Sequence, residues 1–95
     1  MNYTKSTIKT DKEGFNCCPA RRDIKNGLKD ISSAKIVDVT DKEYWQNESD
    51  TLVVLVDNAN DALQLGQFAK NFDADEFNFE AVDNNNSFIV RLWWD

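Results

Sequence analysis

The 95-residue sequence contains no histidine, only one proline and only three glycines. Without histidine, the chain lacks the side chain that most often acts as a general base near neutral pH and binds metal ions. The three glycines are isolated from one another, so no glycine-rich phosphate loop is present. No cluster of acidic residues has the spacing of a calcium loop. We therefore expect a non-enzymatic protein with no cofactor and no metal site.

Cysteine is also scarce, because Cys17 and Cys18 are the only two and they are neighbours. Adjacent Cα atoms lie about 3.8 Å apart, which is closer than a disulfide normally allows. A thiol near Arg21 and Arg22 at the start of a helix has the setting of a nucleophile. However, no general base accompanies it, so a small buried side chain is the favoured interpretation. The pair is typical of a reducing compartment.

Long apolar runs are absent, and the longest aliphatic stretch covers only residues 52–56. A membrane-spanning helix needs roughly 20 apolar residues, so we predict a protein without a membrane segment. The polar first residues show no secretory signal, which favours a cytoplasmic location. A chain of this length is expected to form a single domain over residues 1–95.

Hydrophobic periodicity predicts two helices and four or five strands. Ile24, Leu28 and Ile31 fall on one helical face, whereas the unbroken run at 51–56 is typical of a strand buried on both faces. The predicted elements are a helix at 19–32, strands at 34–39 and 51–56, a helix at 59–72 capped by Asn58, and strands at 77–81 and 87–94. Residues 1–18 are predicted to be either flexible or an edge strand at 3–9.

This order predicts an α+β fold with two helices packed on one face of a mainly antiparallel four- or five-stranded sheet. From residue 19 the order is α-β-β-α-β-β, which suggests two tandem αββ units at 19–56 and 59–94. A strand at 3–9 would instead give a ferredoxin-like order with one additional strand. In both arrangements the face without helices is expected to stay partly open and available to a partner.

The net charge of −6 conceals a strong asymmetry along the chain. Residues 1–35 hold eight basic and four acidic residues, whereas residues 36–95 hold three basic and thirteen acidic residues. A body with a charge of −10 over its last 60 residues repels nucleic acid and attracts basic surfaces. For any single acid, a solvated surface position is the more common role, so the prediction applies to the group.

Aromatic residues supply the second component of a predicted binding surface. Tyr44 and Trp45 interrupt a polar connection, and Trp93 and Trp94 end the last strand. Neighbours in a strand point to opposite faces, so only one of the two tryptophans at 93–94 can enter a given core. Tyrosine and tryptophan are frequent anchors of protein interfaces. The predicted partner-binding residues are Asp41, Glu43, Tyr44, Trp45, Asp73, Asp75, Glu76, Glu80, Asp83 and Trp93.

These features lead to one main functional hypothesis and one alternative. The main hypothesis is a small inhibitor or regulator that docks on a basic surface of another protein, with a nucleic-acid mimic of phage or mobile-element type as its sharpest version. The alternative is a ferredoxin-like domain that binds RNA or DNA through its basic first helix and open sheet face. Direct binding of nucleic acid is disfavoured by the charge, and a homodimer formed through an edge strand, at 3–9 or 87–94, is a further expectation.

Overall fold

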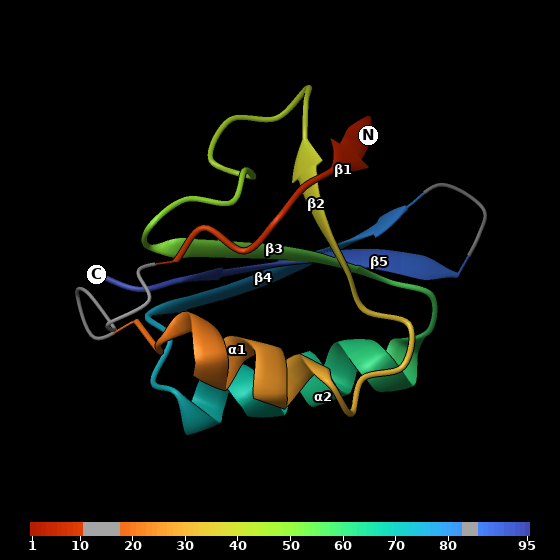
Figure 1. The fold of residues 1–95 in the computed structure, drawn as a ribbon. Coiled ribbons are helices and arrows are strands. Elements are labelled where there is room, and N and C mark those ends of the chain that lie inside the picture. Colours follow the sequence, from red (N-terminus) through yellow and green to blue (C-terminus); the bar gives the residue numbers. More distant parts are fainter. Residues whose placement is uncertain (11–17, 83–85) are drawn as a thin grey trace.

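The computed structural model describes residues 1–10, 18–82 and 86–95. Two helices lie on one side of a five-stranded antiparallel sheet (Figure 1), which confirms the predicted α+β class. The elements follow the order β-α-β-β-α-β-β. They are β1 (Tyr3–Lys5), α1 (Arg21–Leu28), β2 (Lys35–Val39), β3 (Thr51–Val56), α2 (Ala59–Asn71), β4 (Glu76–Val82) and β5 (Ser87–Trp93).

The strand order across the sheet is β1-β2-β3-β5-β4, and every neighbouring pair is antiparallel. β2 and β3, from the first predicted αββ unit, therefore meet β4 and β5, from the second, at the β3–β5 pair. A ferredoxin-like sheet contains a split βαβ unit, whereas β1 and β2 pair directly here. The ferredoxin-like alternative is thus matched in element order but not in strand arrangement.

Several predicted boundaries need correction. The first helix begins at Arg21, because Ala20 has an extended backbone, and it ends at Leu28, where a tight turn brings the Ile31 N–H to the Leu28 carbonyl. The strand predicted at 3–9 covers only residues 3–5. The strand predicted at 87–94 is an inner strand paired on both sides, so it cannot be the edge through which two copies associate.

The main hydrophobic core lies between the sheet and the helices. Residues of β3 and β5 that point toward the helices, such as Leu52 and Val90, are fully buried there. Trp94 is also fully buried, and its indole N–H donates to the Phe72 carbonyl at the end of α2 (2.9 Å). Leu63 of α2, in contrast, points away from this core and is 74% exposed.

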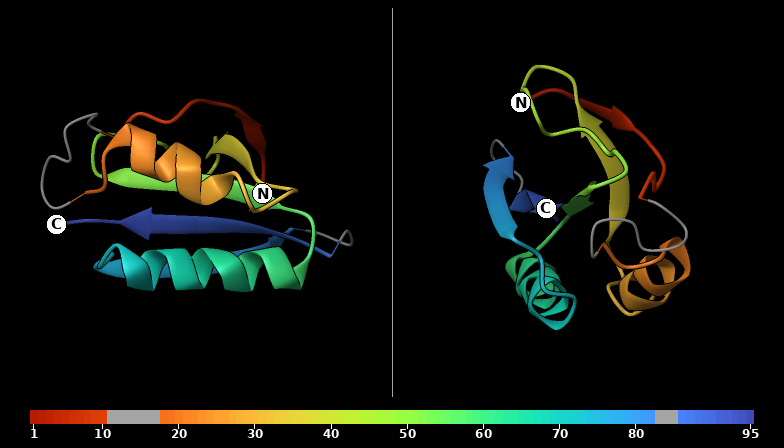
Figure 2. Two further views of the ribbon diagram at one scale, coloured as in Figure 1. Left: turned by 60° about the horizontal axis from the view of Figure 1, so that its bottom comes forward. Right: turned by 90° about the vertical axis from the view of Figure 1, so that its left-hand side faces the viewer.

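A second cluster lies on the opposite face, which corrects the expectation of an open sheet. In the right-hand view of Figure 2 the outer strands turn away from the helices, so that the sheet forms a trough. The segment 40–50 crosses this trough and buries Trp45 in it. The cluster consists of Val37, Val39, Trp45, Val53 and Ile89. β3 is therefore buried on both faces, as its aliphatic run predicts.

Gly27 allows the two helices to pack closely. A Cβ atom at this position would overlap the ring of Phe68, which is itself buried and contacts the Phe72 ring at a centroid distance of 4.7 Å. At Gly66, in contrast, a Cβ atom would make an ordinary 3.5 Å contact with Phe77. The glycine in α1 thus serves packing, although it lowers the intrinsic helix propensity.

We expect Gly27→Ala to destabilise the protein by about 1 kcal/mol, because overpacking costs about 1–3 kcal/mol and exceeds the propensity gain of about 1 kcal/mol. The matched variant Gly66→Ala should be neutral or stabilising, because its methyl group fits. Urea unfolding of both variants checks this expectation. Equal free-energy changes at the two positions would show that Gly27 has no packing role.

Asp61, near the start of α2, connects this helix to the turn before β2. Its carboxylate accepts hydrogen bonds from the Ser33 hydroxyl (2.5 Å) and backbone N–H (3.2 Å). The Asn58 side chain caps the helix by accepting from the Asp61 N–H (2.8 Å), as predicted. The Ser33 hydroxyl bond, which outweighs burial, holds the pKa of Asp61 below its usual value.

A lowered folded-state pKa contributes stability that is present above the unfolded-state pKa of about 3.9 and is lost as the pH falls through the folded value. We therefore expect the melting temperature of the wild type to fall between about pH 5 and pH 2, and Asp61→Asn to reduce this dependence. The exposed Asp30→Asn variant should retain the wild-type dependence. An unchanged pH profile in Asp61→Asn would contradict the assignment.

Candidate binding surface

The segment between β2 and β3 is fixed to the sheet by the buried side chain of Asn47. Its amide N–H group donates to the Val37 carbonyl (2.7 Å) and to the Asp38 carboxylate (3.0 Å), and its oxygen accepts from the Val53 N–H (2.9 Å). β2 and β3 pair only at Lys35–Leu55 and Ile36–Val54. Asn47 therefore bridges the two strands at the position where direct pairing stops.

Further hydrogen bonds fix the rest of the segment. The Val39 N–H donates to the Trp45 carbonyl (2.8 Å), and the Gln46 side chain donates to the Lys42 carbonyl (2.8 Å). Burial disfavours the charged form of Asp38, but hydrogen bonds from the Asn47 backbone and side chain outweigh this effect and lower the pKa of Asp38. Asp38 thus remains ionised and orients Asn47.

Tyr44 and Trp45 point in opposite directions from this segment. Tyr44 has a positive φ of 69°, and its side chain is 71% exposed, whereas Trp45 is only 7% exposed. The Tyr44 carbonyl accepts from the Arg91 side chain (2.7 Å), which holds the turn against β5. A residue such as tyrosine rarely adopts this backbone conformation unless its surroundings impose it. Trp45 therefore supports the segment, and of these two rings only that of Tyr44 is exposed.

A groove of about 890 Å³ lies between this segment and strands β4 and β5. We call it the acidic groove. It brings together six of the predicted binding residues, which come from three separate parts of the chain. They are Glu43, Tyr44, Trp45, Glu76, Glu80 and Trp93.

Two cations in the acidic groove were not predicted. Arg91 pairs with Glu76 at 2.9 Å, and Lys42 pairs with Glu80 while lying 4.4 Å from the centre of the Trp45 ring. Alternation along the last strand predicts that Arg91 points away from the main core, but no sequence signal identifies its partner. These ion pairs neutralise two of the predicted carboxylates.

Negative charge without a paired cation lies beside the groove. Glu43, Glu48 and Asp50 line an adjoining depression, and we call these three residues the acidic rim. Glu43 and Glu48 are exposed, and within residues 1–10, 18–82 and 86–95 neither forms an ion pair. Asp50 accepts from the Thr51 hydroxyl and from the Trp93 indole N–H at 2.8 and 3.2 Å. Within the acidic rim, Glu43 and Glu48 are thus the carboxylates that remain available to another molecule.

The other predicted residues do not line the groove. Asp41 accepts from the Asn2 N–H (2.9 Å), and Asp75 accepts from the Asp95 N–H (2.7 Å). Asp73 follows α2 and lines a shallow depression on the helix side. Asp83 lies outside the described residues.

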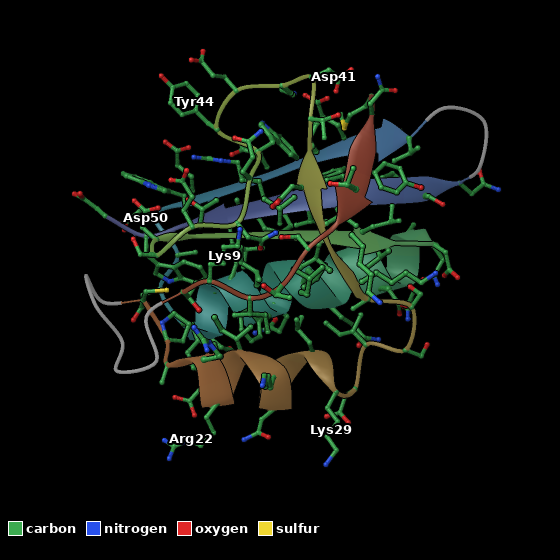
Figure 3. The ribbon with its side chains drawn as sticks, turned by 45° about the horizontal axis from the view of Figure 1, so that its top comes forward. Lys9, Arg22, Lys29, Asp41, Tyr44 and Asp50 are labelled. Carbon is green, nitrogen blue, oxygen red and sulfur yellow. The ribbon has the colours of Figure 1, made fainter. Side chains whose placement is uncertain are left out.

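Basic side chains gather on the other side of the molecule. The exposed residues of α1 and its C-terminal cap include Arg21, Arg22, Lys25 and Lys29. Figure 3 shows Arg22 and Lys29 pointing away from the sheet, with Asp41, Tyr44 and Asp50 on the opposite side. The basic residues of α1 therefore lie on the opposite side of the molecule from Asp41, Tyr44 and Asp50.

Among the residues with described positions, no helix is long and apolar enough to span a membrane. The same part of the chain contains no group of three acidic or cysteine side chains placed to hold a metal ion. Comparisons with protein-family models, curated proteins and solved structures found no match for the chain.

Asn47→Ala is expected to destabilise the protein by about 3 kcal/mol, because it leaves the buried Val53 N–H and Val37 carbonyl without their partner. Asn26→Ala, on the exposed face of α1, should change stability by no more than about 0.5 kcal/mol. Urea unfolding monitored by tryptophan fluorescence measures both. A loss in Asn47→Ala as small as that in Asn26→Ala would show that the bridge contributes little.

Proposed function

We propose that this protein is a non-enzymatic binding module that docks its acidic rim and the exposed Tyr44 ring on a basic surface of another protein. The observation that carries the proposal is the separation of charge: unpaired carboxylates lie around Tyr44, and the basic residues of α1 lie on the opposite side. Such a distribution orients the molecule as it approaches a basic partner.

The two components of the surface have different roles. Exposed carboxylates at the rim of an interface accelerate association, and their effect weakens as salt screens them. An aromatic ring at the centre contributes more to affinity, because it loses contact with water on binding. Tyr44 suits this role because Arg91 holds its backbone in place, so that little conformational freedom is lost on docking.

The contacts within the acidic groove favour binding over catalysis. Arg91 and Lys42 each hold a carboxylate, and Arg91 also holds the Tyr44 carbonyl. These groups stabilise the groove walls, and each already has a partner. The groove therefore supports the binding surface, and the partner contacts the molecule at the acidic rim.

Inhibition by nucleic-acid mimicry is the specific form of this proposal. Carboxylates of the rim would occupy the place of phosphate groups on a partner whose own ligand is DNA or RNA. In that case duplex DNA or RNA would displace the protein from its partner. If nucleic acid does not displace the protein from its partner, the mimicry is rejected, whereas docking on a basic surface is not.

Binding of nucleic acid through α1 is the second candidate. Arg21, Lys25 and Lys29 are spaced at i, i+4 and i+8 and are exposed, which favours contact with phosphates. Binding of bases to the sheet is not supported, because Trp45 occupies the face of the sheet on which the bases would lie. A gel shift at low salt with single-stranded and duplex RNA and DNA tests the remainder.

The Glu43→Lys/Glu48→Lys double variant is expected to lose its partner while retaining wild-type stability, because both side chains are exposed. Affinity capture from the native host, quantified by mass spectrometry, compares this variant with the wild type at low and high salt. The partner should bind at least tenfold less to the variant, since two repulsive contacts replace two attractive ones.

The matched control is Asp30→Lys, which adds positive charge on the opposite side of the molecule, beside α1. This control should capture the partner as the wild type does. If every protein captured by the wild type also binds the double variant equally well, the acidic rim is not the docking surface.

A further inference from the structure

β4 forms the longer of the two edges of the sheet, with seven residues against three in β1. The right-hand view of Figure 2 shows β4 as the outermost strand on its side of the trough. The strand pairs with β5 on one side only. An edge of this kind presents backbone N–H and carbonyl groups to a further strand.

An aromatic side chain is exposed along this edge. Phe79 is 56% exposed, and alternation along β4 places it on the same face as Phe77, which packs against the main core. Its ring lies 6.0 Å from Phe77 and 6.0 Å from Phe88, measured between ring centroids. Phe79 is thus the exposed member of a cluster of three aromatic rings, and it lies on the edge strand of the sheet.

We propose that two copies of this protein pair antiparallel through β4, with Phe79 of each copy opposite Phe79 of the other. The twofold axis runs perpendicular to the sheet, so the helices of both copies lie on the same side. The two five-stranded sheets then form one sheet of ten strands. Each Phe79 ring packs against its counterpart instead of facing water.

The sequence of β4 favours this register over its neighbours. With Phe79 at the centre, all seven residues overlap, Glu80 lies opposite Asn78, and Glu76 lies opposite Val82. Every carboxylate therefore faces a neutral side chain, and the Asn78 amide can donate to Glu80 of the other copy. A register centred on Asn78 places Glu76 opposite Glu80, and one centred on Glu80 places that residue opposite itself. Like charges directly opposite destabilise strand pairing.

The dependence on salt concentration distinguishes this dimer contact from the docking on a basic partner proposed above. Each copy carries a net charge of −6, so two copies repel one another, and salt should strengthen their pairing by screening that repulsion. Salt should weaken docking on a basic partner for the same reason. The two interactions can therefore be tested independently: failure of the dimer to form does not affect the measurement of docking, and the reverse also holds.

Sedimentation equilibrium of the full chain at low and high salt tests the proposal. A single strand edge makes a small interface, below roughly 1,200 Å², so the dimer should be weak and a wide range of protein concentrations is needed. We expect the dimer fraction of the wild type to rise with concentration and with salt. Phe79→Lys should be monomeric throughout, because it places a charge at the centre of the contact.

Leu63→Lys is the matched control, because Leu63 is also exposed and apolar but lies on the outer face of α2. It should dimerise as the wild type does. Phe79→Cys tests the register separately: residues directly opposite in a strand pair are close enough for a disulfide after small adjustments, so it should form a covalent dimer on mild oxidation. Leu63→Cys should not.

Two results would overturn the proposal. One is a wild type that stays monomeric at both salt concentrations, together with equal cross-linking of Phe79→Cys and Leu63→Cys. The other is a dimer that Phe79→Lys retains, which would place the contact elsewhere on the molecule.

Discussion

The side chain of Asn47 bridges β2 and β3 where their direct pairing ends, and the arrangement of the binding surface depends on this bridge. A buried amide group is costly to leave without partners, but here both its N–H group and its oxygen are satisfied. The bridge allows β2 to turn away from β3 while the backbone groups of Val37 and Val53 stay hydrogen-bonded. The trough, the burial of Trp45 and the outward position of Tyr44 all follow from this separation.

The second hydrophobic cluster explains how so small a domain supports a charged surface. A chain of this size has little apolar area to bury. Because β3 is buried on both faces, its side chains contribute to both hydrophobic clusters. The segment 40–50 covers the second cluster with Trp45, and its carboxylates consequently lie outside, at the rim. Arg91 and Lys42 then hold the segment against β4 and β5. The exposure of Glu43 and Glu48 is therefore a consequence of how the chain covers its second core.

Much of the fold could be predicted from local patterns in the sequence. The aliphatic run of β3, the Asn58 cap of α2 and the alternation in β4 each carry a signal within a few residues. The sequence overestimates the length of the first helix, because the apolar stripe up to Ile31 is compatible with a longer helix. Only the structure shows that Ala20 is extended and that a tight turn follows Leu28.

The candidate site could be predicted only in part, because its contacts join distant segments. Acidic and aromatic residues indicated the composition of the surface, and six of them meet in one groove. The ion pairs of Arg91 and Lys42 span 15 and 38 positions in the sequence, and no local pattern indicates them. Asn47 gave no signal at all, since a polar residue in a polar connection suggests solvent exposure. Its role depends on the gap between β2 and β3.

Amide hydrogen exchange at Val53 and Val39 tests the central role of Asn47 most directly. The Val53 N–H donates to the Asn47 side chain, and the Val39 N–H donates to the Trp45 carbonyl within the segment that Asn47 fixes. We predict that both amides are protected in the wild type and exchange much faster in Asn47→Ala, whereas Val90 in β5 keeps its relative protection. Unchanged protection of Val53 and Val39 in this variant would show that Asn47 does not hold this part of the structure together.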